Sequence, residues 1–166
     1  MEVTMPGITR SRHSGVLFSE LKAWIREHLT GQRSMNSQST RFENSIEKIE
    51  HIGKMSPGWN GFKAAVADAS VRHAAISFLQ EVGQRFPSDV HEPTIVAPTP
   101  DGGVAIEWRL ADAPRCFELV FMPHGAREWA LREKERTIDY AEDANEAELF
   151  DLMKRHVAGH TTIILK

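Results

Sequence analysis

The hydrophobic pattern changes its period near residue 93, and this change constrains the fold more than any other feature. Before it, apolar residues recur at helical spacing, most clearly over residues 70–86. After it, short alternating segments are separated by turn residues; they cover residues 94–98, 103–109, 115–122 and 126–132. Helices followed by a run of short strands predict an α+β fold, an antiparallel meander of four to five strands with helices packed on one face.

Signals at the segment ends refine this prediction. Thr40 and Glu43 have the spacing of a capping box, so a helix is expected to begin there. Asp68 or Ser70 can cap the helix over 70–86, and a last helix is expected after Asp143. The β-branched run at residues 161–166 is a candidate for a further strand.

The first residues form an N-terminal arm. Over residues 16–30 the apolar residues follow one helical stripe, and a polar stretch rich in Ser, Gln and Asn comes after it, which predicts a linker. We therefore expect an arm and linker over residues 1–38 and a single α+β domain over 39–166. The stripe can be buried on the protein's own core, on a second copy or on another protein. Its candidate partner-binding residues are Leu17, Phe18, Leu21, Trp24 and Ile25.

The hairpin formed by 103–109 and 115–122 can be registered on its apolar residues. Placing Arg109 opposite Cys116 brings three large apolar pairs onto one face: Trp108 with Phe117, Ile106 with Leu119, and Val104 with Phe121. The same register sets Glu107 directly opposite Glu118 on the other face. Two carboxylates that face each other directly across neighbouring strands repel each other unless a cation or a proton lies between them.

Two interpretations of the Glu107/Glu118 pair follow. In the first, which we favour, Arg109 and Arg132 complete an alternating charge ladder on a solvated sheet face. In the second, the two carboxylates and the two arginines bind a small ligand or a metal ion, or carry out acid/base chemistry. Too few further ligands can be placed to predict a metal site, and no catalytic residue or cofactor is predicted.

The stretch 56–64 contains Trp59 between glycines, just ahead of a helix. Its indole can cover the helix–sheet core, which we favour, or it can open onto a binding cleft as a candidate ligand-binding residue.

Two motifs carry a resemblance. Gly58-Trp59-Asn60-Gly61, and later Pro98-Thr99-Pro100-Asp101-Gly102-Gly103 leading to Glu107-Trp108, resemble the marks of a loose group of small, functionally uncharacterised bacterial proteins. The resemblance covers about residues 45–135 and leaves out the arm. Asn60 stands where that group tends to have Asp. The resemblance implies fold boundaries and no particular activity.

Composition excludes several classes of protein. The hydrophobic fraction of 41% and the charged fraction of 26% are typical of a folded globular protein. The net charge of −3 does not favour nucleic acid as a partner, although residues 1–41 hold six Lys or Arg against three Glu. A single cysteine, Cys116, suits a cytoplasmic location, and no apolar run predicts a membrane span.

These patterns favour a non-enzymatic interaction protein. We expect it to bind another protein or a second copy of itself through the N-terminal helix, and an antitoxin-like partner or regulator is the concrete form considered. The alternative is a ligand-binding or metal-binding protein, or an enzyme, that uses the Glu107/Glu118 face.

Overall fold

The computed structural model describes residues 41–110, 114–134 and 136–158. All described residues lie in the second of two units into which the chain divides, residues 36–166. The N-terminal stripe and the expected division after residue 38 lie outside the described residues.

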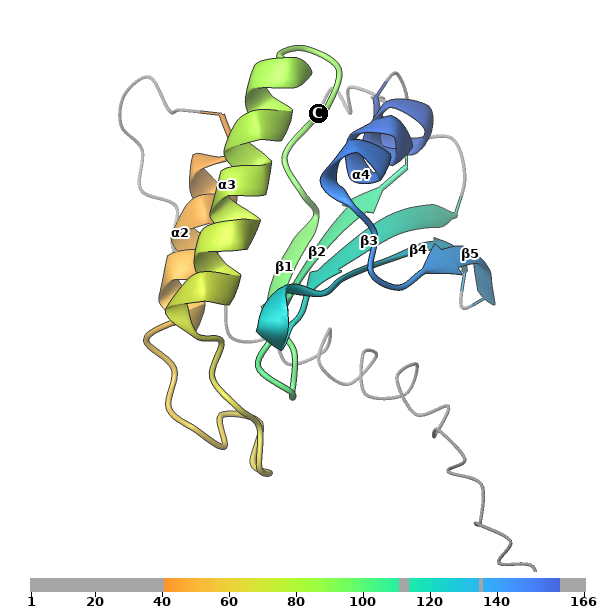
Figure 1. Ribbon diagram of the computed structural model, residues 1–166. Helices are drawn as coiled ribbons and strands as arrows, with labels where there is room; N and C mark the ends of the chain where they lie inside the picture. The colour runs from red at the N-terminus through yellow and green to blue at the C-terminus, as the bar shows by residue number, and fades with distance from the viewer. Residues whose placement is uncertain (1–40, 111–113, 135, 159–166) are drawn as a thin grey trace, which may run out of the picture. The chain divides into compact units, whose positions relative to one another are not determined.

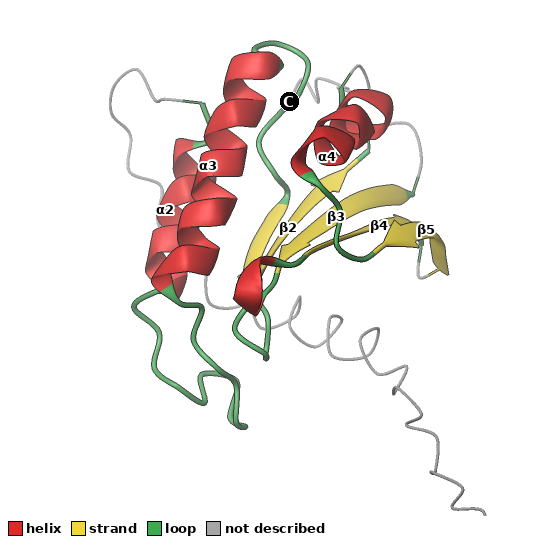
Figure 2. Cartoon of the chain, viewed as in Figure 1, coloured by secondary structure: helices red, strands yellow, loops and turns green. Residues whose placement is uncertain are grey.

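The described residues form an α+β fold, which confirms the prediction (Figure 1). Five antiparallel strands follow one another in the sheet in chain order, as a meander does. In Figure 2 the helices α2, α3 and α4, in red, lie on one side of the yellow sheet. The elements are α2 (Glu43–Ile52), α3 (Ala69–Arg85), β1 (Ile95–Pro98), β2 (Val104–Arg109), β3 (Arg115–Phe121), η1 (Pro123–Gly125), β4 (Arg127–Glu133), β5 (Arg136–Ala141), α4 (Glu146–Leu152) and η2 (Met153–Val157).

The predicted register of the central hairpin is confirmed residue by residue. Trp108 lies opposite Phe117, Glu107 opposite Glu118, and Arg109 opposite Cys116. One face of β2 and β3 therefore points into the hydrophobic core together with buried residues of the three helices. Trp108 and Phe117 are fully buried there, and their ring centroids lie 6.3 Å apart.

The beginning of α2 differs from the prediction. The N-cap is Phe42, which is buried and has a left-handed φ of 66°, and no side chain of the cap bonds to the helix. The expected capping box at Thr40 and Glu43 is therefore wrong. Glu92 provides the acceptor instead, because its Oε1 receives the backbone N–H of Ser45 at 2.8 Å and the Ser45 hydroxyl at 2.6 Å. Long-range contact replaces the local cap.

The caps of the other two helices come from their own segments. Asp68 accepts the backbone N–H of Val71 at 3.0 Å, which confirms it as the cap of α3. The last helix, α4, is capped by Asn145, whose side chain accepts the N–H of Glu148 at 3.0 Å.

The fifth strand, β5, was not predicted. All its residues but Ala141 are exposed, so residues 136–141 lack the alternation that identifies a half-buried strand. The run at 161–166, which was expected to supply a strand, lies outside the described residues.

Candidate functional site

Four of the five predicted ligand-binding residues lie together on the sheet face opposite the helices. We call this the outer face, and define it by Glu107, Arg109, Glu118 and Arg132. The Arg132 Nε lies 2.8 Å from the Glu118 Oε2, and the Arg109 Nε lies 3.5 Å from the Glu107 Oε1. The alternating arrangement of carboxylates and guanidinium groups is therefore present as predicted.

The solvation of this arrangement was predicted wrongly. Glu107 is 3% exposed and Glu118 is 2% exposed, so neither carboxylate is on a solvated surface. Both lie in central strands of the sheet, where neighbouring strands flank them on both sides. The Arg132 side chain is itself only 19% exposed beside Glu118. Alternating polar residues indicate which face a side chain is on, but not how far that face is shielded from water.

Burial changes the chemistry of this pair. A charged carboxylate in the interior is stable only when a cation or hydrogen-bond donors accompany it. Each of the two has an arginine close by, and the Arg132–Glu118 contact is the shorter and the more buried. The outer face thus presents paired charges, which can hold the sheet together or recognise a partner.

Trp59 lies elsewhere, in the loop between α2 and α3. Its Nε1 donates to the Ala65 carbonyl at 3.1 Å, and Ala65 forms a parallel bridge with Asp101 in the turn between β1 and β2. The two motifs on which the resemblance was based are therefore neighbours in space. Trp59 is only partly buried, and its hydrogen bond connects two positions within the loop.

The turn between β1 and β2 is itself fixed by hydrogen bonds. The Thr99 hydroxyl accepts the Gly103 N–H at 2.7 Å, and the Thr99 N–H donates to the Gly103 carbonyl at 3.0 Å. A Cβ on Gly103 would lie 2.7 Å from the Phe121 carbonyl oxygen, so no larger residue fits without movement. These contacts give the Pro-Asp-Gly-Gly stretch a structural role.

Phe62 is the aromatic residue that sequence reasoning missed. It is 81% exposed, the largest exposed fraction among the large hydrophobic residues described. Trp59 and Phe62 lie three residues apart in one glycine-rich loop, and only the tertiary contacts decide which ring faces inward. The available sequence signal was a Phe between Gly61 and Lys63 that belongs to no periodic apolar pattern.

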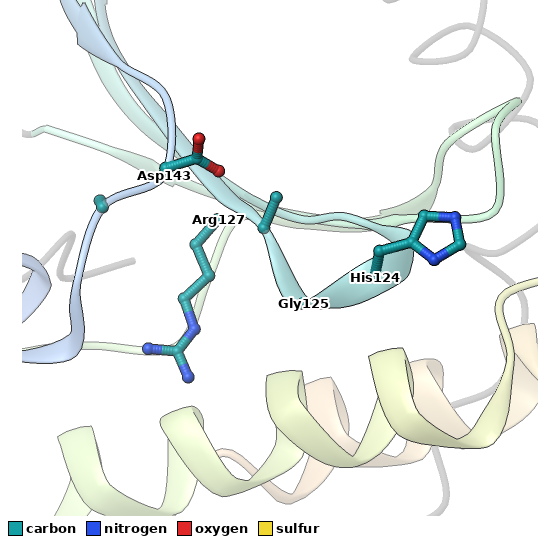
Figure 3. A pocket seen from close by; sticks show the side chains of 6 residues that line it. His124, Gly125, Arg127 and Asp143 are labelled. Atoms are coloured by element: carbon teal, nitrogen blue, oxygen red, sulfur yellow. The ribbon is translucent and has the colours of Figure 1, made fainter.

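Two hollows on the described surface do not gather reactive groups. One, of about 300 Å³, is lined by residues around His124, Arg127 and Asp143. Figure 3 shows these three side chains pointing in different directions. A second, of about 630 Å³, lies around Glu133, Lys134 and Arg136 and is open to solvent. In neither hollow do two reactive side chains converge on a common position.

Other reactive groups are dispersed over the part of the chain that the structure describes. Within it, no three His, Cys, Asp or Glu residues lie close enough to hold a metal ion together. His156 stacks on Phe117 with ring centroids 6.5 Å apart. Two carboxyl groups with altered acidity belong to α3: a hydrogen bond from the Ser70 hydroxyl lowers the pKa of Asp68, and one from Arg85 lowers the pKa of Glu81.

Comparison with known proteins adds no family: no protein-family model, no curated protein and no solved structure matches the chain. Among the described helices, none combines the length and the apolar character needed to cross a membrane.

Proposed function

We propose that this protein is a non-enzymatic interaction protein that holds another protein. The observation that carries this proposal is Phe62, an aromatic side chain held out into solvent by a braced loop. Aromatic residues, Phe among them, are enriched at protein interfaces, and each ring buries a large apolar area. A ring left in water by the free protein is a natural anchor for an apolar pocket of a partner.

The loop around Phe62 is built to keep its shape. The Gly58 N–H donates to the Ala64 carbonyl at 2.8 Å, and the Gly61 N–H donates to the Gly58 carbonyl at 2.9 Å. The Asn60 side chain accepts the Phe62 N–H at 2.9 Å. Gly58 and Gly61 have φ values of 75° and 79°, a region that suits glycine. A rigid loop loses little entropy on binding, which strengthens an interface.

An antitoxin-like role, in which one protein binds and restrains another, is the concrete form of this proposal. The amphipathic arm supports it, because its stripe of Leu17, Phe18, Leu21, Trp24 and Ile25 requires a surface to cover it. The arm would then supply a second contact with the same partner, and two linked contacts bind more tightly than either alone.

The test is capture of a partner from the source organism with the full chain. We expect one protein to be retained in stoichiometric amount and to be lost with Phe62→Ser. Ile138→Ser, which removes an exposed apolar side chain from strand β5 and leaves the Phe62 loop unchanged, is the matched control and should retain it. If the wild-type chain retains nothing, or if both variants bind equally well, the proposal is wrong.

A second function is favoured by the burial of Glu107 and Glu118, because paired buried carboxylates also occur at ligand sites. In this case the outer face binds a divalent cation or a small charged ligand. A ligand present at about 100 times its dissociation constant stabilises the fold by about 2.7 kcal/mol. Thermal unfolding with Mg²⁺, Ca²⁺, Mn²⁺ and Zn²⁺ in turn should then raise the Tm of the wild type but not that of Glu107→Gln. Unchanged melting temperatures exclude the cations.

A further inference from the structure

The two edges of the sheet differ in how far other parts of the fold cover them. At one edge, β1 has four residues, includes Pro98, is almost wholly buried and lies against α2. At the other, β5 has six residues, no proline or lysine, and a fully exposed run from Arg136 to Tyr140. Bare edge strands pair readily with other strands, and proteins usually cover or interrupt them. Within the described part of the chain, β5 has a neighbour on one side only.

The exposed aromatic side chain of β5, Tyr140, lies on the outer face. Tyr140 lies opposite Ala130 of β4, which in turn lies opposite Glu118. Tyr140 is 66% exposed and Ile138 is 49% exposed. Ile138 lies at an irregularity of the pairing between β4 and β5, so only Tyr140 is assigned to this face by its register. The edge therefore offers backbone groups that β4 does not pair, together with the exposed Tyr140 ring. The Tyr140 N–H itself donates to the Asp139 carboxylate at 2.9 Å, a bond that a new strand would replace.

A bulge divides β5 into two parts. Asp139 pairs with Leu131 and Thr137 pairs with Arg132, so Ile138 is an extra residue without a counterpart in β4. From Asp139 to Ala141 the pairing is regular. A new strand is therefore expected to pair with the segment around Tyr140.

The composition of this segment suits a second copy of itself. The strand holds one cation, Arg136, and one anion, Asp139, so two copies carry no net repulsion. Antiparallel pairing about a two-fold axis at Asp139 would set two carboxylates opposite each other, which is unfavourable. An axis at Tyr140 sets Tyr140 against its counterpart and Asp139 against Ala141. Two aromatic rings then meet directly across the strands.

We propose that β5 pairs with β5 of a second copy around Tyr140. The two sheets join into one, with the helices of both copies on the same side, in a two-fold symmetric dimer. This proposal is independent of the proposed function, because it uses neither Phe62 nor the arm.

A contact of a few residues per copy is small, so the dimer is expected to be weak and to depend on concentration. Interfaces well below about 1,000 Å² are typical of weak, transient complexes, so we expect a dissociation constant in the micromolar range or above. Sedimentation of the full chain from about 5 to about 500 µM covers this range. Amide exchange at Tyr140, whose N–H donates to the Asp139 carboxylate and not to β4, should slow as the concentration rises.

Tyr140→Lys is the decisive variant, since a lysine at an edge strand blocks pairing by charge and solvation. We expect it to weaken dimerisation at least about tenfold, which is about 1.4 kcal/mol. Phe62→Lys makes the same kind of change at another exposed aromatic residue and should leave the dissociation constant within about twofold of the wild type. Circular dichroism checks that both variants are folded.

Any of the following three outcomes would overturn the proposed dimer. A wild-type chain that stays monomeric throughout excludes the dimer. Loss of the dimer in Leu21→Lys, with Tyr140→Lys unaffected, assigns dimerisation to the arm. The third outcome is amide exchange in β5 that is slow at every concentration and becomes fast in Ile164→Lys. That result would show that the chain's own residues 161–166 pair with β5. A partner that is still captured through Phe62 leaves the proposed function standing in all these cases.

Discussion

The two faces of strands β2 and β3 are both buried, but different forces hold them. On the core face, Trp108 packs against Phe117 and its Nε1 donates to the His91 carbonyl at 3.1 Å. One residue earlier in the same strand, Glu107 lies on the outer face beside Glu118 and two arginines. Apolar burial stabilises the first face without regard to direction, whereas the second depends on the distance and shielding of each ion pair.

The largest loss of stability is expected from a substitution at Trp108. Trp108→Ala is expected to lower the free energy of unfolding by about 3–5 kcal/mol, because it empties a fully buried aromatic site. Chemical denaturation monitored by far-UV circular dichroism measures this change. A loss under about 1 kcal/mol would mean that the core face contributes much less than its burial indicates.

Glu118→Gln tests the stronger ion pair of the outer face. The Arg132–Glu118 contact of 2.8 Å is nearly buried, so removing the charge leaves a shielded guanidinium without its nearest anion. We expect a loss of about 2 kcal/mol. Relief of the repulsion from Glu107 keeps the loss below that at Trp108. A stability equal to that of the wild type would show that the pair contributes nothing net.

Glu107→Gln is the matched control, since the same change is made on the opposing strand. Arg109 is 57% exposed and lies 3.5 Å from Glu107, so water competes with this contact. The expected change in the free energy of unfolding is under about 1 kcal/mol. If Glu107→Gln instead lowers the free energy of unfolding by more than about 2 kcal/mol, the hydrogen bonds of this carboxylate stabilise the fold as much as those of Glu118.

The smallest effect is expected outside both faces, at the exposed cap of α3. Hydrogen bonds from the Ser70 hydroxyl and then from the Val71 N–H lower the pKa of Asp68. Because the pKa is lower in the folded than in the unfolded state, this stabilisation is present above the unfolded-state pKa and is lost as the pH falls through the folded-state pKa. NMR titration should show a higher pKa for Asp68 in Ser70→Ala. No difference between the two proteins would contradict this cause.

The candidate site could be predicted in part. Alternation and the pairing of large apolar residues gave the register, and the register placed Glu107, Glu118, Arg109 and Arg132 on one face. The burial of the carboxylates could not be predicted, because it depends on what surrounds the sheet in three dimensions. The same holds for Trp59 and Phe62, whose loop carries no periodicity to distinguish the inward ring from the outward one.

The sequence by itself determined the α+β class, the order of the first four strands and a cap at Asp68 or Ser70, because each depends on neighbours within a few residues or on a period of two. Only the tertiary structure decided the start of α2, where Glu92 reaches Ser45 across the fold. It alone also revealed β5, whose exposed residues follow no buried pattern, and the shielding of the outer face. Local patterns record which side of an element faces the core, whereas long-range contacts decide what covers the other side.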